Sequence, residues 1–381
     1  MVCGYPENEV LILLQQKGYK YRIYPNLCQE RQISSFCGCC RYVYNRCIDY
    51  RKEVYASEHR NASRFECMRK VTGMRNDPET AWLKECDSMA LQESVKDLNK
   101  AYQGFFEKRS GYPKYHRKHD RSQSYRTRNQ ENGIRFEGNS IRLPKLGLVK
   151  VKKSREFSGR ILNATISRTA SGKYYVSLCA EEEVIPKANA GGMAGIDVGV
   201  KSFFADSNGN TVENPKTLHR YEKKLAREQR RLSRKEKGSH NREKQRVRVA
   251  AIHEKIADTR TDFLHKVSSK LVSDNQVIGI EDLHVKGMLR NHKLAKAISD
   301  VSWGEFVRML EYKAFEHGTA VIRVPRFYAS SQTCSCCGYK NPEVKDLSVR
   351  SWRCPECGAV HDRDHNAAVN ILNKALEIAA V

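Results

Sequence analysis

The sequence predicts a multidomain α/β protein, in which a helical segment and a small β-barrel precede an α/β domain that carries an inserted cysteine module. Three observations support this prediction. The chain has 381 residues, enough for two or three domains with their own cores. Beyond residue 192, short apolar strands alternate with long helices, a pattern typical of α/β domains. Near the end of the sequence, two Cys-x2-Cys pairs interrupt that pattern.

The net charge of the chain indicates a polyanionic partner. It is +24, with a sequence pI near 9.5, and lysine and arginine are spread along the whole length. Nucleic acid fits such a field best, and an anionic membrane surface is the alternative. The sequence has no lipidation motif, and its apolar run Val10–Leu14 is too short for a signal peptide core or a membrane span. We therefore expect a cytoplasmic protein whose cysteines are reduced or bound to metal.

The first part of the chain is predicted as strand, then helix. Residues 1–17 show no clear pattern, and alternation over Tyr19–Tyr24 predicts a strand. From residue 29 to about 106 the periodicity is helical, with apolar residues on one face at Leu91, Val95, Leu98, Tyr102 and Phe105. We predict a helical domain over residues 27–110.

Short strands return between residues 122 and 183. The segments 134–136 and 141–143 flank a turn and predict a hairpin, and 149–152, 164–168 and 173–178 alternate as strands. These strands, together with the first, predict a small β-barrel domain formed by residues 1–26 and 111–185. The small-residue segment 186–192 predicts a domain boundary.

The second half predicts a compact α/β domain over residues 193–329 and 361–381. Its strands are expected at 194–198, 202–206, 277–280 and 320–324, with a helix at 302–317 and a closing helix at 366–380. Two long basic helices are expected at 218–236 and 241–272. The first carries seven cations against two glutamates, so we expect Arg227, Arg230, Arg231 and Arg234 to bind nucleic-acid phosphates. A solvated hairpin is the alternative.

Three isolated carboxylates fall at strand ends and at the start of the last helix. Asp197 lies in an apolar strand, Glu281 ends another strand, and Asp364 precedes the closing helix. Each has an ordinary alternative: a paired core aspartate, a loop residue or a helix N-cap. Together, in this order, they resemble the ribonuclease-H-like fold, whose central sheet gathers such groups to hold divalent cations for phosphodiester cleavage. Asp362 is the alternative third carboxylate, and we choose Asp364 because the helix follows it directly.

The inserted module, residues 330–360, has the ligand spacing of a zinc ribbon. Cys334 and Cys337 form one pair, and Cys354 and Cys357 form the other. Four thiolates in two turns close a tetrahedral site, which makes the zinc structural rather than catalytic. A redox Cys-x2-Cys motif is the alternative. Cys336 is not expected to be a ligand, and Cys37, Cys39, Cys40 and Cys47 are expected to be buried small residues.

These segments together resemble the TnpB family, also called OrfB, which are transposon-encoded relatives of the type V CRISPR effectors. The resemblance covers most of the chain, although residues 1–17 precede the family's usual start. Its opening strand, first helix and barrel segment resemble Tyr19–Asn26, Cys39–Asn45 and Leu143–Gly147. Its three RuvC motifs resemble Gly195–Gly199, Ile280–Leu283 and Asp362–Ala368, and its zinc module opens like Ser330–Cys334.

The resemblance implies an RNA-guided DNA endonuclease that binds a transposon-end RNA and cuts double-stranded target DNA beside a short flanking motif. It implies a RuvC nuclease domain in which Asp197, Glu281 and Asp364 are catalytic and hold magnesium or manganese. It also implies zinc on the four cysteines. Two alternatives stay open from the residues: an unguided transposase or resolvase with the same site, and a zinc-ribbon nucleic-acid-binding repressor. The intact carboxylates argue against the repressor.

Overall fold

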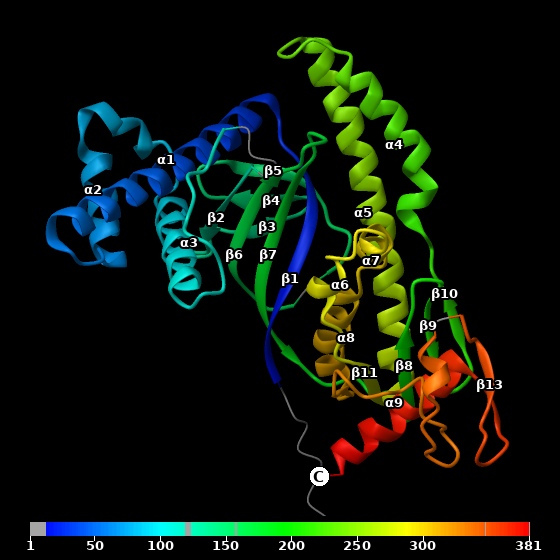
Figure 1. Cartoon of the computed structure of the whole chain (residues 1–381). Helices are drawn as coiled ribbons and strands as arrows, with labels where there is room; N and C mark the ends of the chain where they lie inside the picture. The colour runs from blue at the N-terminus through cyan, green and yellow to red at the C-terminus, as the bar shows by residue number, and fades with distance from the viewer. Residues whose placement is uncertain (1–12, 119–122, 157, 347, 381) are drawn as a thin grey trace, which may run out of the picture. The chain divides into compact units, whose positions relative to one another are not determined.

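A computed structural model describes residues 13–118, 123–156, 158–346 and 348–380 of the chain. These residues form two compact units, one of Leu14–Glu183 and one that begins at Val184 (Figure 1). Both units mix helices with sheets, so the predicted α/β class is confirmed. In the part of the chain that the structure describes, no helix is long and apolar enough to cross a membrane.

The unit of Leu14–Glu183 joins a helical layer to an antiparallel sheet. Its helices are α1 (Leu27–Glu58), α2 (Arg64–Asn76) and α3 (Ser88–Phe106), with a 3-10 helix, η1 (Pro78–Lys84), between the last two. Asn26 caps α1 through a capping box with Gln29, and Ser63 caps α2 in the same way with Glu66. Buried residues of α1 and α3 share one apolar core with the strands, so helices and sheet stabilise each other.

The sheet of this unit has seven strands, in the order β2-β6-β7-β1-β5-β4-β3. Their bounds are β1 (Leu13–Tyr24), β2 (Gln123–Arg128), β3 (Arg135–Glu137), β4 (Ser140–Leu143), β5 (Gly147–Lys152), β6 (Arg160–Arg168) and β7 (Tyr174–Val184). The predicted hairpin is confirmed, because β3 pairs with β4 in antiparallel register. Closure into a barrel stays a prediction, since in the pairing of the described residues β2 and β3 are the edge strands.

The second unit is built on a five-stranded sheet with the order β10-β9-β8-β11-β12. Its strands are β8 (Gly192–Val198), β9 (Ser202–Asp206), β10 (Thr211–Glu213), β11 (Asn275–Glu281) and β12 (Ala320–Val324). β8, β9 and β10 pair antiparallel, whereas β8, β11 and β12 are parallel. The carboxyl ends of β8 and β11 therefore lie side by side, at the edge of the sheet where α/β proteins usually bind ligands.

Helices cover both faces of this sheet. Ala194, Ile196, Ile278 and Ile280 pack in one apolar core with α5 (His240–Asp274) and α8 (Trp303–His317). Because side chains alternate along a strand, the residues between them face the other side. That side packs on α9 (Arg363–Ala379), which contacts β8, β11 and β12.

Two glycines let α9 lie directly on the strands. Gly195 and Gly279 are register partners on β8 and β11. A Cβ at Gly195 would collide with the carbonyl oxygen of Ala368 and the amide of Leu372, and one at Gly279 would lie 2.8 Å from Cβ of Ala375. The close approach of α9 therefore requires glycine at both positions.

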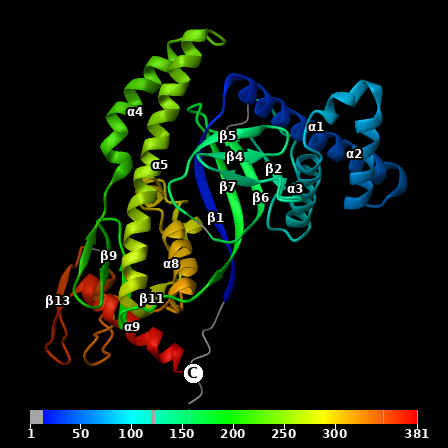
Figure 2. The same ribbon diagram turned by 180° about the vertical axis from the view of Figure 1, so that it is seen from behind.

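A helical hairpin projects from this unit. It consists of α4 (Thr217–Ser233) and α5, which lie side by side in the views of Figures 1 and 2. Leu225 on α4 packs against Val249, Ile252 and Ile256 on α5, so the hairpin has its own small core. The short helices α6 (Val285–Met288) and α7 (Ala295–Val301), which the sequence did not predict, connect β11 to α8.

The cysteine module lies between β12 and α9. It contains a 3-10 helix, η2 (Pro342–Lys345), and a short hairpin of β13 (Ser351–Arg353) and β14 (Val360–Asp362). Strand β14 leads directly into α9, which begins at Arg363. The prediction that the closing helix starts at residue 366 is therefore three residues late, because Asp362 already caps the helix.

Candidate functional site

Two of the predicted carboxylates stand on neighbouring parallel strands. Ile280 on β11 is the register partner of Ile196 on β8, so Asp197 and Glu281 follow at matching positions at the carboxyl ends. Each comes two residues after a glycine on the face that α9 covers. The segments Gly-Ile-Asp (195–197) and Gly-Ile-Glu (279–281) thus repeat one pattern. In each, a glycine lies under α9 and an acidic residue follows two positions later, near the carboxyl end of the strand. The repeat is visible in the sequence and could have predicted that these two acids lie on paired strands.

The third carboxylate comes from the start of α9, where Asp362 and Asp364 have different roles. The carboxylate of Asp362 accepts hydrogen bonds from the backbone N–H groups of Asp364 and His365, at 3.1 and 2.9 Å. Asp362 is therefore the N-cap. Asp364 lies in the first turn, and its carboxylate is 3.5 Å from Nη1 of Arg350. We chose Asp364 over Asp362 because we expected the helix to begin directly after it. That reason is wrong, since Asp364 lies inside α9.

The electrostatics of Asp197 indicate that the three carboxylates form one group. Burial raises the pKa of Asp197 well above its usual range, and the charges of Glu281 and Asp364 raise it further. Arg363 and Arg350 oppose the shift. Burial also raises the pKa of Glu281, although Ser330 Oγ donates a hydrogen bond to its Oε1 at 2.9 Å and lowers that pKa in part. Carboxylates whose pKa is raised by burial and by like charges are frequent at functional sites.

The three carboxylates are spread more widely than the ligand atoms of the cysteine cluster. Among the described residues, the groups of potential ligands whose atoms all lie within 4.8 Å of one another consist of cysteines and His361, and the three carboxylates do not form such a group. Asp364 lines a cleft of about 860 Å³ together with Asp362 and His365. Two exposed lysines, Lys201 and Lys216, lie on the same cleft.

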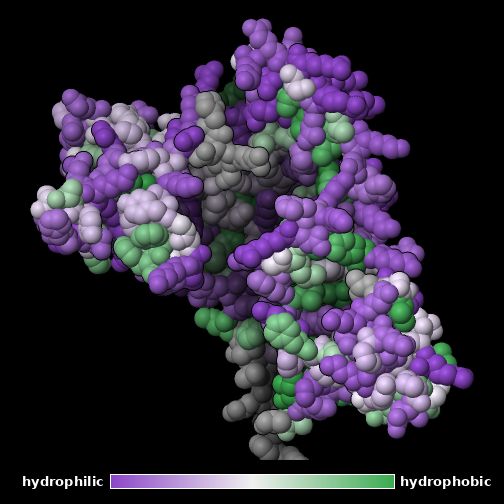
Figure 3. Space-filling model, in the orientation of Figure 1, coloured by the Kyte–Doolittle hydropathy of each residue, from purple (hydrophilic) through white to green (hydrophobic). Residues whose placement is uncertain are grey.

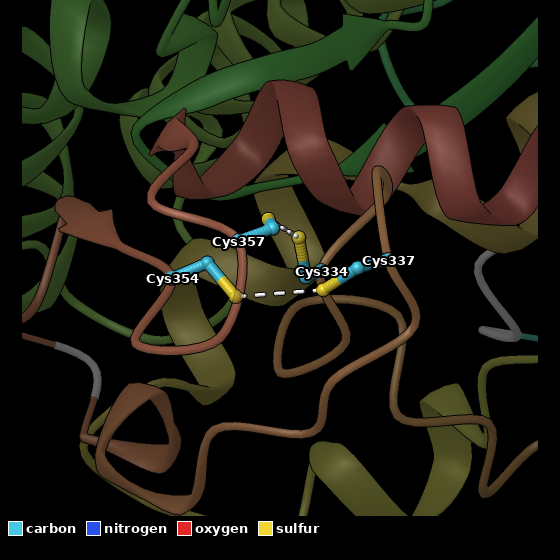
Figure 4. A group of neighbouring side chains, drawn as sticks. All are labelled: Cys334, Cys337, Cys354 and Cys357. Carbon is cyan, nitrogen blue, oxygen red and sulfur yellow. Dashed lines mark hydrogen bonds between the residues drawn. The ribbon is translucent and has the colours of Figure 1, made fainter.

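The four predicted cysteine ligands converge on one point (Figure 4). Sγ of Cys334 lies 3.6 Å from that of Cys357, and Cys337 lies at the same distance from Cys354. Four sulfurs around a tetrahedral zinc ion are separated by roughly 3.8 Å, so the set fits zinc. Gly338 and Gly358 have φ values of 80° and 74° after the second cysteine of each pair, which lets both turns close.

His361 is a neighbour of this cluster that sequence reasoning missed. Its Nε2 lies 3.0 Å from Sγ of Cys334, and its ring packs on Trp352. Burial opposes ionisation of Cys334, but the N–H groups of Cys336 and Cys337 and the His361 imidazole outweigh it and lower the pKa of this thiol to about 6. The thiolate is the form that binds metal. Cys334, Cys336 and His361 also lie close enough together to hold an ion, so Cys336 is nearer the site than we expected.

Two asparagines join the first cysteine pair to α9. Asn366 Nδ2 donates to the carbonyl oxygen of Thr333 at 2.7 Å, and Asn370 Nδ2 donates to that of Ser330 at 2.8 Å. Arg363 Nη1 also donates to the carbonyl oxygen of Asp346 at 2.7 Å. The cysteine module thus fixes the turn of α9 that carries Asp364.

The structure divides the predicted arginines of α4 into two pairs. Arg227 and Arg231 contact the buried carboxylate of Glu228, at 3.4 and 2.8 Å. Arg230 and Arg234 have no ion pair among the described residues. The part of Figure 3 where Figure 1 places α4 and α5 is mainly hydrophilic.

The other cysteines of the first unit behave as predicted. Cys37, Cys39, Cys40 and Cys47 are buried.

Comparison with known proteins identifies the family. A relative from Streptomyces pristinaespiralis, named "Putative RNA-guided DNA endonuclease", is 39% identical over 374 residues, which are 97% of this chain and 92% of the relative. A second, from Escherichia coli K12, has the same name with the suffix InsQ and is 34% identical over 93% of this chain and 91% of its own length. This chain belongs to the TnpB family. The family models for OrfB of IS605, described as "Probable transposase", and for the "Cas12f1-like, TNB domain" match residues 177–292 and 303–371 of this TnpB protein.

A solved structure supports the fold. The Cas12f1 chain from a complex with single guide RNA and target DNA superposes with a TM-score of 0.61 at 13% sequence identity, over 94% of this chain and 99% of that one. A third family model, "Helix-turn-helix domain", matches residues 15–60. In this TnpB protein that segment is strand β1 followed by the single helix α1.

Proposed function

We propose that this protein is an RNA-guided, metal-dependent DNA endonuclease of RuvC type, with a ribonuclease-H-like nuclease domain. The observation that carries the proposal is the position of Asp197, Glu281 and Asp364 at the same end of the sheet, where the pKa of Asp197 is raised by burial and by the other two charges. Three carboxylates that share a partly buried site are stable in their ionised form only with cations nearby. The names of its relatives support the choice of DNA as substrate and RNA as guide.

The three carboxylates would hold magnesium or manganese, since their hard oxygen ligands suit these ions. When bound, the ions activate water and stabilise the leaving oxygen of a phosphodiester. Other residues of the chain would position the three carboxylates and the DNA strand. Glycines 195 and 279 bring α9 onto the strands, the Asp362 cap fixes the first turn of α9, and Ser330 orients Glu281. Lys201 and Lys216 on the cleft would attract the phosphates of the DNA strand.

The rest of the chain would hold the guide. The charge of +24 suits a long nucleic acid whose sequence is read by base pairing, while the protein grips the backbone. We assign this role to the helical domain, the seven-stranded sheet and the exposed arginines of α4. The four-cysteine module would hold structural zinc beside the site.

The experiment that tests this function is a guide exchange. The protein is purified with its RNA, the RNA is sequenced, and its guide segment is replaced by a new one. Cleavage is then measured on plasmids that carry either target beside a randomised flank. We expect cutting to follow the new guide, to require magnesium or manganese, and to fall at least a hundredfold in Asp197→Ala, Glu281→Ala and Asp364→Ala, because removing a member of such a site removes the metal geometry.

RNA binding by the three variants serves as the control, and it should match that of the natural protein. Cleavage that ignores the new guide, or that continues after the RNA is removed, would favour an unguided transposase or resolvase. Guided binding without any cleavage would favour a repressor.

A further inference from the structure

One aromatic side chain beside the candidate site is almost fully exposed. Phe327 is 93% exposed, whereas the other large hydrophobic residues on the surface that the structure describes are at most 76% exposed. Single apolar side chains are common on protein surfaces, but a ring with both faces in water is open to a flat partner. Phe327 follows β12 and lies three residues after Val324, which is the register partner of Glu281.

The turn that carries Phe327 is held in place on both sides of the ring. The N–H of Tyr328 donates to the carbonyl oxygen of Pro325 at 2.9 Å and closes the turn. Arg326, one residue before the ring, donates from Nη2 to Oδ2 of Asp282 at 2.6 Å. Tyr328, one residue after it, packs against apolar residues of β12 and α9. The turn is therefore fixed, while the ring of Phe327 projects from it into solvent.

This fixed turn is close to the candidate carboxylates. Ser330, three residues after Phe327, donates from Oγ to Oε1 of Glu281 at 2.9 Å. Three residues of extended chain span at most roughly 11 Å. Nucleotides of a stacked strand repeat about every 3.4 Å. A base that lies against Phe327 would therefore belong to a nucleotide only a few positions away from one held at Glu281.

The order of the strands places Phe327 and the basic cleft on opposite sides of the carboxylates. Asp197 and Glu281 stand on the central strands β8 and β11. Lys201, which lines the cleft, precedes β9 on one side of them, and Phe327 follows β12 on the other. A DNA strand that crosses the carboxyl ends of β8 and β11 would thus meet a cation before the carboxylates and a free aromatic ring after them.

We propose that Phe327 stacks on one base of the DNA strand that is being cut and thereby fixes where the backbone crosses the carboxylates. This proposal rests on the proposed function and names a residue that positions the strand. Every base has a flat face and the ring has no polar group, so the contact would not select a sequence. Since the turn is already fixed, stacking would cost little conformational entropy.

The partner of the ring is an unpaired strand. A base inside a duplex is paired and stacked on its neighbours, so it cannot offer a face to Phe327. The strand displaced by RNA pairing supplies unpaired bases. A second copy of this chain is a poorer partner, because two molecules with a net charge of +24 repel each other.

The test is a base-deletion scan of the cut strand. The RNA-loaded protein is given target DNA whose displaced strand carries one abasic site, moved in single steps through the cut position. The natural protein should cut roughly 5- to 150-fold more slowly when one particular base is missing, the range expected from one base–aromatic stack. Phe327→Ala should cut intact DNA equally slowly, and removal of that base should slow it no further, because the ring is already absent.

Two other substitutions separate stacking from apolar contact. Phe327→Trp keeps an aromatic face and should retain both the rate and the response to the missing base. Phe327→Leu keeps only apolar volume and should behave like Phe327→Ala. The matched control is Phe315→Ala, since Phe315 is 48% exposed on the last turn of α8, which leads to the amino end of β12, away from the carboxylates. It should cut and scan like the natural protein, and melting curves verify that all four variants fold.

A fluorescence measurement detects the stack without cleavage. One base at a time of the displaced strand is replaced by 2-aminopurine, and the DNA is bound to the RNA-loaded, inactive Asp364→Ala protein. Stacking should quench the fluorescence at the position found by the scan, and adding Phe327→Ala should restore it. A DNA-free natural protein that is dimeric, and a Phe327→Ala variant that is monomeric, would instead assign the ring to a contact between copies and overturn the proposal.

The two possible failures can be told apart. If the natural protein cuts guided DNA and Phe327→Ala or Phe327→Leu cuts at the same rate with the same scan, the stacking contact is overturned and the nuclease stays intact. If the natural protein cuts no DNA, the proposed function fails. The fluorescence series then still decides on Phe327, since signals that are equal with and without Phe327→Ala at every position overturn the stack.

Discussion

At the scale of single residues, the buried carboxylate of Asp197 should destabilise the metal-free protein at neutral pH. Its pKa is raised by burial and by two neighbouring acids. A carboxyl group whose pKa is raised in the folded state contributes most to the free energy of unfolding below its unfolded pKa, about 3.9 for aspartate. That contribution is lost as the pH rises through the pKa of the folded state. The folded unit should therefore become less stable towards neutral pH when divalent cations are absent.

This behaviour gives the first residue-scale prediction. Asp197→Asn should melt higher than the natural protein at pH 7 in a chelator, by about 2–4 °C for each kcal/mol of relieved repulsion, and the gain should shrink towards pH 4. Magnesium should stabilise the natural protein more than the variant. Scanning calorimetry at several pH values measures both effects. A variant that melts lower at pH 7 would contradict the assigned origin of the pKa shift.

A second prediction separates Asp362 from Asp364. Asp364→Ala should abolish cleavage with little change in melting temperature, because its carboxylate belongs to the charge group around Asp197 and does not cap α9. Asp362→Ala should remove the N-cap and cost about 1 kcal/mol of stability. It should retain measurable cleavage, since Asp364 is still present. Cleavage and thermal unfolding of the two variants are compared side by side, and a reversed pattern would make Asp362 the third ligand.

Candidate metal ligands could be recognised in the sequence from their residue type and spacing. The four cysteines have a spacing that few other structures require, and isolated acids after apolar strands are conspicuous. The roles of His361, Asn366 and Asn370 could not be predicted, because a single histidine or asparagine has no pattern of its own. Their function comes from partners far away in the sequence, such as Cys334 and Thr333.

At the scale of elements, the cysteine module holds the start of α9 in place. Freshly purified, reduced protein should contain about one zinc ion for each chain. Cys354→Ser should lower that content, make residues 330–360 more sensitive to limited proteolysis, and reduce cleavage, since β14 leads into Asp362. Metal analysis and proteolysis make the measurement. The exposed Cys28, which lies outside the cluster, offers Cys28→Ser as the control. Protein that is active without zinc would falsify this role.

The arginine pairs of α4 give the second element-scale prediction. Arg230→Glu with Arg234→Glu should weaken binding to any nucleic acid and lower the slope of log affinity against log salt by about 2, one for each lost phosphate contact. The matched pair Arg227→Glu with Arg231→Glu breaks contacts to Glu228 and should chiefly destabilise the hairpin. Binding titrations at several salt concentrations and melting curves distinguish them. An unchanged slope in the first variant would place the phosphate contacts elsewhere.

Most elements could be predicted because their periodicity is local. The strands β8, β9, β11 and β12 and the helices α4, α5 and α8 lie within a few residues of the predicted bounds. The start of α9 was misplaced because Asp362 acts as a cap two residues before the acid that we favoured. The short helices α6 and α7 were missed, since segments of four and seven residues show too little periodicity to be recognised.

At the scale of the whole molecule, the net charge predicted nucleic-acid binding, whereas RNA guidance was predicted from the family resemblance alone. The excess of lysine and arginine indicated a nucleic-acid partner. RNA guidance itself has no residue pattern, because base pairing reads the sequence while the protein contacts backbone. The order of strands in each sheet also had to come from the structure. Antiparallel neighbours in the first unit, such as β1 and β5, lie more than a hundred residues apart in the sequence.

The glycine contacts beneath α9 tie cutting to the completion of folding. Asp197, Glu281 and Asp364 come from segments that are remote in sequence, and they meet only after two parallel strands have paired and α9 has docked on Gly195 and Gly279. Contacts between such distant segments form slowly, because a long loop must close first. We therefore expect a partly unfolded chain to bind nucleic acid through its basic residues without cutting it. Proteolysis that removes α9 should leave a fragment that binds nucleic acid and cuts none.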